Sequence, residues 1–244
     1  MLNGPAHKQC QSKAGPTFKR ATLTWKRFSS FDQSDGAKAH QFNHSSAIRQ
    51  CLSGKKVHLY GDSTIRQWFE FLDALLSGNA QELIRDSPKK TGPYMIWGEK
   101  FIYVPTSLLR FIANELDELL GGPNTVLVIG IWAHFDPFPI ELYIRRLQSI
   151  RRAVVHLLNR APGTLVVIKT ANLREVTVDL ALSYSDWYTF QQDKVLRAVF
   201  RGLKVQMVDA WEMTLANHLS HNIHPQCPIV KNMINILLSY ICPQ

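Results

Sequence analysis

The sequence has 244 residues, of which 45% are hydrophobic and 19% are charged, and its formal net charge is +9. This length and apolar content suit one large domain with its own core, and they exclude a chain that is disordered throughout. The positive charge suits an anionic partner, but Lys and Arg occur in short dispersed pairs such as Lys89-Lys90 and Arg151-Arg152. Such pairs are typical of solvated helix faces, so we predict no binding to nucleic acid.

Two regions follow from the pattern of apolar residues. Residues 1–50 lack sustained periodicity and are predicted to form an irregular or poorly ordered arm before one domain at 51–244. From Lys56 onward, short apolar runs alternate with longer amphipathic stretches, as expected of strands joined by crossover helices. The predicted strands are 57–60, 101–104, 125–132, 164–170 and 205–209. The predicted helices are 64–76, 108–120, 139–160, 187–200 and 230–241.

The most apolar segment is TVLVIGIW at 125–132. A run of this kind is typical of a central strand that helices cover on both faces. Because parallel strands need right-handed crossovers, the element order predicts an α/β three-layer sandwich. Its ligand site would lie at the carboxyl ends of the strands.

Ser63 follows the first predicted strand and opens the first predicted helix. Its hydroxyl would lie beside unpaired backbone N–H groups and the positive end of the helix dipole, which stabilise an oxyanion. The alternative is an ordinary N-cap serine, which is common. A nucleophilic Ser63 would need a general base within hydrogen-bond reach, usually a histidine.

Nine histidines compete for the role of that base. Five lie in the arm, inside a predicted strand or inside a helix, where structural or solvated roles are expected. His134 follows the central strand, and His218, His221 and His224 lie between the last strand and the last helix, at the predicted site edge. We predict His224 as the base because Pro225 restrains its loop, with a surface-loop histidine as the alternative.

The acid of a catalytic triad is less clearly marked. Asp209 ends the predicted strand 205–209 and could hold the His224 ring in one tautomer. A Ser-His dyad, in which a backbone carbonyl orients the ring, is the alternative. Asp62 adjoins the nucleophile, and we expect it to brace the turn.

The four cysteines show none of the paired spacings of zinc sites, so we predict no metal and leave one or two disulfides open. No run of about 18 apolar residues occurs, and Met1–Gln11 has no apolar core of the kind a signal peptide requires. We therefore predict no transmembrane segment and no signal peptide in this chain. Asn43 begins an N-glycosylation sequon, which matters only in the secretory pathway.

Three stretches, at residues 57–72, 130–175 and 208–242, together resemble the neurexophilin and PC-esterase (NXPE) family. They contain the Gly-Asp-Ser turn, the segment GIWAHFDPFPIELYIRR and the terminal histidine, and the match spans about residues 50–242. Three ordered motifs of this length are far more specific than an isolated Gly-Asp-Ser. The resemblance implies the family's carboxyl-terminal PC-esterase domain, a relative of SGNH or GDSL hydrolases with a flavodoxin-like parallel sheet.

Within the family's pattern, Ser63 matches the motif serine and His224 matches the terminal histidine. SGNH relatives usually place the triad acid three residues before this histidine. This chain has His221 there, followed by Asn222, so the resemblance leaves the acid open and Asp209 is our substitute.

SGNH relatives also draw oxyanion donors from a Gly and an Asn that follow strands. Here Gly130 is available, and His134 would replace the Asn because a neutral imidazole N–H can donate. Arg66, one turn into the first predicted helix, could bind an anionic sugar or carboxylate. Structural roles are the alternative for His134 and Arg66.

The resemblance implies a serine-dependent O-acyl, in particular O-acetyl, transferase or esterase that acts on glycans such as sialic acids through a Ser63 acyl-enzyme. No resident cofactor is expected, although a transferase would need an acetyl donor such as acetyl-CoA. The implied partner is a glycan or glycoprotein, and the implied location is the secretory pathway or the cell exterior. Family members carry a signal or anchor and a neurexophilin-like region, so we expect a truncated form. The alternative is a catalytically inactive interaction protein that retains the fold.

Overall fold

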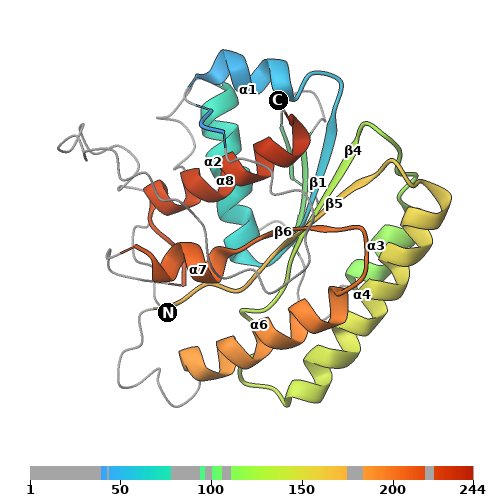
Figure 1. Cartoon of the computed structure of the whole chain (residues 1–244), viewed down its shortest axis with the longest axis vertical. Coiled ribbons are helices and arrows are strands. Elements are labelled where there is room, and N and C mark those ends of the chain that lie inside the picture. Colours follow the sequence, from blue (N-terminus) through green and yellow to red (C-terminus); the bar gives the residue numbers. More distant parts are fainter. Residues whose placement is uncertain are drawn as a thin grey trace.

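The computed structural model of the chain places a six-stranded sheet between two layers of helices (Figure 1). The structure describes residues 40–42, 44–77, 94–96, 101–105, 111–174, 184–217 and 223–243. The strands are β1 Lys56–Gly61, β2 Tyr94–Ile96, β3 Phe101–Pro105, β4 Thr125–Gly130, β5 Leu165–Lys169 and β6 Gln206–Val208. The helices are α1 Ser45–Cys51, α2 Ser63–Ser77, α3 Ile112–Glu118, α4 Ile140–Arg160, α6 Asp186–Phe200, α7 Ala210–Leu215 and α8 Cys227–Ile241.

The strand order across the sheet is β2-β3-β1-β4-β5-β6. All strands except β2 run parallel, and β2 pairs antiparallel with β3 at the edge. Numbered among themselves in chain order, the five parallel strands run 2-1-3-4-5, which is the flavodoxin-like order. The predicted α/β three-layer fold is therefore confirmed. In this order the topological switch point, where ligands bind, lies between β1 and β4.

The side chains of the central strands alternate between the two helical layers. Val57 and Leu59 of β1 belong to the apolar cluster formed with α1, α2 and α8. Leu127 and Ile129 of β4 belong to the cluster formed with α3, α4 and α6. Figure 1 shows these two helix groups on opposite sides of the sheet. Since both faces are covered, the central strands carry continuous apolar runs rather than alternating ones.

The predicted boundary at residue 51 is too late. Phe42 is buried, and its backbone N–H donates to Asn235 Oδ1 at 3.2 Å. Ile48 of α1 is also buried in the core. The part of the predicted arm at residues 40–42 and 44–50 therefore belongs to the folded domain, while the remainder lies outside the described residues. A helix of two turns carries too little periodicity to be recognised from the sequence.

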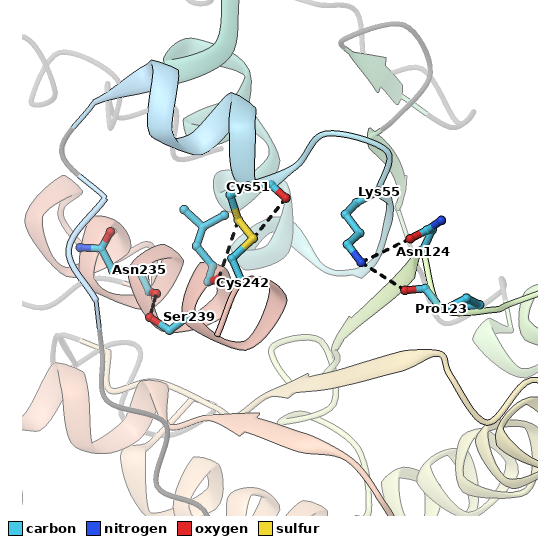
Figure 2. Close-up of a disulfide and its surroundings, with 8 residues drawn as sticks. Cys51, Lys55, Pro123, Asn124, Asn235, Ser239 and Cys242 are labelled. Atoms are coloured by element: carbon cyan, nitrogen blue, oxygen red, sulfur yellow. Dashed lines mark hydrogen bonds between the residues drawn. A yellow bond between two sulfur atoms is a disulfide. The ribbon is translucent and has the colours of Figure 1, made fainter. Parts of the chain in front are cut away.

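A disulfide joins Cys51, the last residue of α1, to Cys242, directly after α8 (Figure 2). In the same region, Lys55 Nζ donates to Pro123 O at 3.2 Å and to Asn124 Oδ1 at 3.4 Å. These contacts attach the connection between α1 and β1 to the loop before β4. In the described ranges, no helix is long and apolar enough to cross a membrane.

Candidate active site

Ser63 and His224 lie in contact although 161 residues separate them in the sequence. Ser63 is half-buried and opens α2 directly after β1, and His224 lies on the segment before α8. The distance from His224 Nε2 to Ser63 Oγ is 2.8 Å. At this distance an imidazole can accept the hydroxyl proton directly.

Asp62 holds the turn that presents the nucleophile. Its Oδ1 accepts from the backbone N–H of Thr64 at 2.9 Å and from the Thr64 hydroxyl at 2.7 Å. Its Oδ2 accepts from the backbone N–H groups of Trp132 and Ala133, at 3.4 Å and 3.1 Å. The carboxylate therefore caps α2 and attaches the loop after β4 to the nucleophile turn, which confirms its predicted bracing role.

The first turn of α2 supplies one available backbone donor beside the nucleophile. The N–H of Thr64 donates to the Asp62 carboxylate, and the N–H groups of Ile65 and Arg66 donate to the Asp62 carbonyl. The Ser63 N–H makes no hydrogen bond to any other residue that the structure describes. It is therefore the donor of this turn that an oxyanion on the attacked carbonyl could use.

Two glycines let α2 approach the sheet. Gly61 and Gly130 face each other in the ladder between β1 and β4, and Ile65 packs over them. A Cβ on Gly61 would lie 2.4 Å from both Gly130 O and Ile65 Cγ1, and one on Gly130 would lie 2.5 Å from Ile65 Cγ1. The close approach of α2 to the sheet thus explains why residue 130 is a glycine. The role of Gly130 as an oxyanion donor stays a prediction.

His134 and Arg66 both lie near the nucleophile turn. His134 is exposed and directly follows Ala133, whose N–H binds Asp62. Arg66 Nε lies 3.3 Å from Glu70 Oε1, in a pair whose side chains are 44% and 28% exposed. Exposed pairs of this kind contribute little, so an anionic substrate could replace Glu70. Substrate or oxyanion roles for His134 and Arg66 stay predictions.

The contacts of the Asp209 carboxylate give it a structural role that requires no part in catalysis. Its Oδ1 accepts from the Glu212 backbone N–H at 3.1 Å, which caps α7, and lies 2.7 Å from Arg197 Nη2. β6, which precedes Asp209, is separated from β1 by β4 and β5. The role of Asp209 as the triad acid stays a prediction. His221 and Asn222, the residues at the usual acid position, lie outside the described residues.

Three polar side chains that were not predicted hold the segment around the predicted base. Gln67 Nε2 donates to Pro225 O at 2.7 Å, and Asn172 Nδ2 donates to Ile223 O at 3.2 Å. Lys169 Nζ donates to Asn172 Oδ1 at 3.0 Å. The available signal in the sequence was a lysine that ends the otherwise apolar strand β5, followed by an asparagine at the predicted site edge.

Buried charges surround this edge of the sheet. Lys169 is completely buried, and burial lowers its pKa to about 8 although Asp62 and Asp193 favour its charged form. Asp136, on the loop after β4, lies 2.6 Å from Arg174, on the loop after β5. Burial raises the pKa of Asp136 to about 6, and the Arg174 guanidinium opposes this shift. The buried ion pair thus joins the two loops that flank the site.

Within the described ranges, no group of three or more His, Cys, Asp or Glu side chains is arranged to hold a metal ion. The site offers the Ser63 hydroxyl, the His224 imidazole and the Ser63 backbone N–H. This set can carry out nucleophilic acyl transfer.

Comparison with known proteins identifies a family and similar solved structures. The family model described as "NXPE family member 4-like, C-terminal domain" matches residues 33–242. A solved structure of the lipase Lip_vut3 from goat rumen metagenome matches with a TM-score of 0.43 and 11% sequence identity. That match covers 76% of this chain and 97% of the lipase chain.

Proposed function

This chain belongs to the NXPE family, and we propose that it is a serine-dependent O-acyl transferase or esterase that acts on glycans. The observation that carries the proposal is the contact of 2.8 Å between His224 Nε2 and Ser63 Oγ. This contact lies at the amino end of α2, beside the switch point of the sheet. It also favours catalysis over the alternative of an inactive interaction protein, for which no such contact is required.

In the first half of the reaction, Ser63 Oγ attacks the carbonyl carbon of an acyl ester. His224 Nε2 takes the hydroxyl proton as the new C–O bond forms, and negative charge develops on the former carbonyl oxygen. The Ser63 N–H and the positive end of the α2 dipole stabilise this charge. The bond to the leaving alcohol then breaks, the alcohol oxygen takes the proton from Nε2, and the acyl group remains on Ser63.

In the second half, a hydroxyl group attacks the acyl-enzyme and His224 takes its proton. The Ser63 Oγ leaves the acyl carbon and recovers the proton from Nε2, which restores the starting state. If the attacking hydroxyl belongs to water the protein is an esterase, and if it belongs to a sugar the protein is a transferase. A transferase would draw its acetyl group from a donor such as acetyl-CoA, in which case a thiol leaves in place of the alcohol and takes the proton from Nε2.

Two features support an O-acetylated glycan, such as a sialic acid, as the substrate in the secretory pathway. Cys51 and Cys242 form a disulfide, and Cys227 is disulfide-bonded as well. Disulfides persist mainly in oxidising compartments, where glycoproteins are assembled and displayed. The formal charge of +9 would favour an anionic glycan over a neutral one.

The test is the release or transfer of acetyl groups from O-acetylated and unmodified sialoglycans by the purified chain. We expect Ser63→Ala and His224→Ala each to lower the rate by at least about 10³-fold, because both act in the same step. Ser149→Ala, at a half-buried position of α4, and His156→Ala, at an exposed position of α4, are the matched controls and should keep the wild-type rate.

Two results would overturn the proposal. One is a folded wild-type protein that turns over no acyl ester, with or without an acetyl donor. The other is a Ser63→Ala protein that retains the wild-type rate. The first result would support the inactive interaction protein instead.

A further inference from the structure

We infer that Gln67 and Asn172 form a clamp that positions the His224 imidazole against Ser63. The inference rests on the proposed function, because it assigns positioning residues to the same serine and histidine. The side-chain amide N–H groups of Gln67 and Asn172 donate to backbone carbonyls next to His224. Both act through the backbone of the residues on either side of His224.

The clamp binds the backbone on both sides of His224. Asn172 Nδ2 donates to the Ile223 carbonyl at 3.2 Å, and Gln67 Nε2 donates to the Pro225 carbonyl at 2.7 Å. The proline ring also fixes the φ angle of Pro225. Since the chain is held before and after His224, the direction of its side chain is restricted before any substrate binds.

Lys169 sets the orientation of the Asn172 amide. An ammonium group has donors only, so the atom that faces Lys169 Nζ at 3.0 Å must be the amide oxygen. The amide N–H groups therefore point the other way, toward Ile223 O and Leu173 O. Lys169 and Asn172 are completely buried, so water cannot readily replace either partner.

Gln67 sets the spacing between nucleophile and base. It lies four residues after Ser63 on α2, so the two side chains share one face of the helix. The helix that carries the Ser63 hydroxyl therefore also carries the contact to Pro225. Any displacement of α2 moves both together, which preserves the 2.8 Å contact between Nε2 and Oγ.

The clamp should affect the chemical step more than substrate binding. A misplacement of about 1 Å in a catalytic group can lower a rate about 10²-fold. Loss of either amide donor should therefore lower kcat roughly tenfold to a hundredfold while KM stays near the wild-type value. A purely structural role would lower thermal stability without this selective effect on kcat.

The experiment measures the second-order rate at which a fluorophosphonate probe labels Ser63 in the folded chain. In this reaction Ser63 Oγ forms a bond to phosphorus, fluoride leaves, and His224 takes the hydroxyl proton. The rate reports how well His224 activates Ser63, whatever the natural substrate is. Thermal unfolding of each variant establishes that the compared proteins are folded.

Two variants of Gln67 separate the effect of its hydrogen-bond donor from the effect of its side-chain volume. Gln67→Met keeps the length of the side chain but has no N–H, and it should label roughly tenfold to a hundredfold more slowly. Gln67→Lys keeps a donor that can reach Pro225 O, so it should recover most of the wild-type rate.

The control for Asn172 is Asn235, another buried asparagine. Asn172→Asp keeps an acceptor for Lys169 but has no N–H for Ile223 O, and it should slow labelling to a similar degree as Gln67→Met. Asn235→Asp makes the same chemical change at a buried site in α8, where Oδ1 accepts from the Phe42 N–H. That control should label at the wild-type rate.

Two outcomes separate failure of the clamp from failure of the proposed function. Slow labelling of His224→Ala together with wild-type rates for folded Gln67→Met and Asn172→Asp would overturn the clamp alone. Equal labelling of wild type and His224→Ala would overturn the serine mechanism and the clamp with it. A Gln67→Lys protein as slow as Gln67→Met would overturn the role assigned to the Gln67 donor.

Discussion

At the scale of single residues, Asp62 shows how one carboxylate can organise a site without taking part in the chemistry. It is buried and accepts from four donors, which are the N–H and hydroxyl of Thr64 and the N–H groups of Trp132 and Ala133. Two of these donors belong to α2 and two belong to the loop after β4. The same carboxylate therefore fixes the nucleophile turn and the loop that faces it.

Replacement of Asp62 by Ala should lower the free energy of unfolding by about 3 kcal/mol. The physical reason is that buried donors lose a charged acceptor, each at a cost of about 1–3 kcal/mol before water or neighbouring groups compensate. Chemical denaturation of the two proteins gives the difference directly. Asp117→Ala, at an exposed position of α3, is the control and should change the value by less than about 0.5 kcal/mol. An Asp62→Ala protein as stable as this control would contradict the argument.

The sequence predicted the pair Ser63 and His224 because Ser63 follows a predicted strand, His224 precedes the last predicted helix on a loop restrained by Pro225, and both match a family motif. It did not predict Gln67, Asn172 and Lys169. The reason is physical, since their roles depend on which backbone carbonyl faces each donor after folding. Every residue has a backbone carbonyl, so residue type does not indicate that those of Ile223 and Pro225 accept these donors. A contact to them therefore cannot be predicted from composition or spacing.

At the scale of elements, the length of a helix or strand determines whether the sequence predicts it. The long helix expected at 139–160 is α4, at Ile140–Arg160, because its apolar stripe repeats over several turns. The strand predicted at 125–132 ends at Gly130 instead, since the N–H groups of Trp132 and Ala133 turn toward Asp62. Elements that the sequence analysis missed, namely α1, β2 and α7, have three to seven residues each. Tertiary contacts rather than periodicity define such short pieces.

The packing of α2 on the sheet gives a prediction about pairs of elements. In Gly130→Ala the new Cβ would meet Ile65 Cγ1 at 2.5 Å and Cδ1 at 2.6 Å, and overpacking of this kind costs about 1–3 kcal/mol. Because the clash is with one side chain, Ile65→Ala should relieve it, and the double variant should be more stable than the sum of the single effects implies.

Gly61 is the control position for this comparison of single and double variants. A Cβ there would also meet the backbone oxygen of Gly130 at 2.4 Å, which no side-chain truncation can remove. Ile65→Ala should therefore rescue Gly130→Ala and not Gly61→Ala, as measured by the free energy of unfolding. Equal rescue at both positions, or additive effects in both cycles, would show that α2 does not rest on these glycines.

At the scale of the whole molecule, the ends of the described chain are fastened to each other. Phe42 and α1 pack against α8, and the Cys51–Cys242 disulfide lies where α1 and α8 both end (Figure 2). The cross-link spans a sequence separation of 191 residues, so it encloses every strand of the sheet and both Ser63 and His224. A closure of this length restricts the unfolded chain far more than the folded one.

The double variant Cys51→Ser/Cys242→Ser should therefore lose about 2–5 kcal/mol of stability and unfold at a lower temperature than the wild type. Below that temperature its Ser63 should still react with a fluorophosphonate at the wild-type rate, because the contacts that hold Ser63 and His224 come from Asp62, Gln67 and Asn172. Thermal unfolding and labelling rates, measured on the same samples without reductant, separate the two effects. A variant with unchanged stability would show that packing of α1 on α8 suffices without the cross-link. A variant that is folded but labels slowly would show that the disulfide also shapes the site.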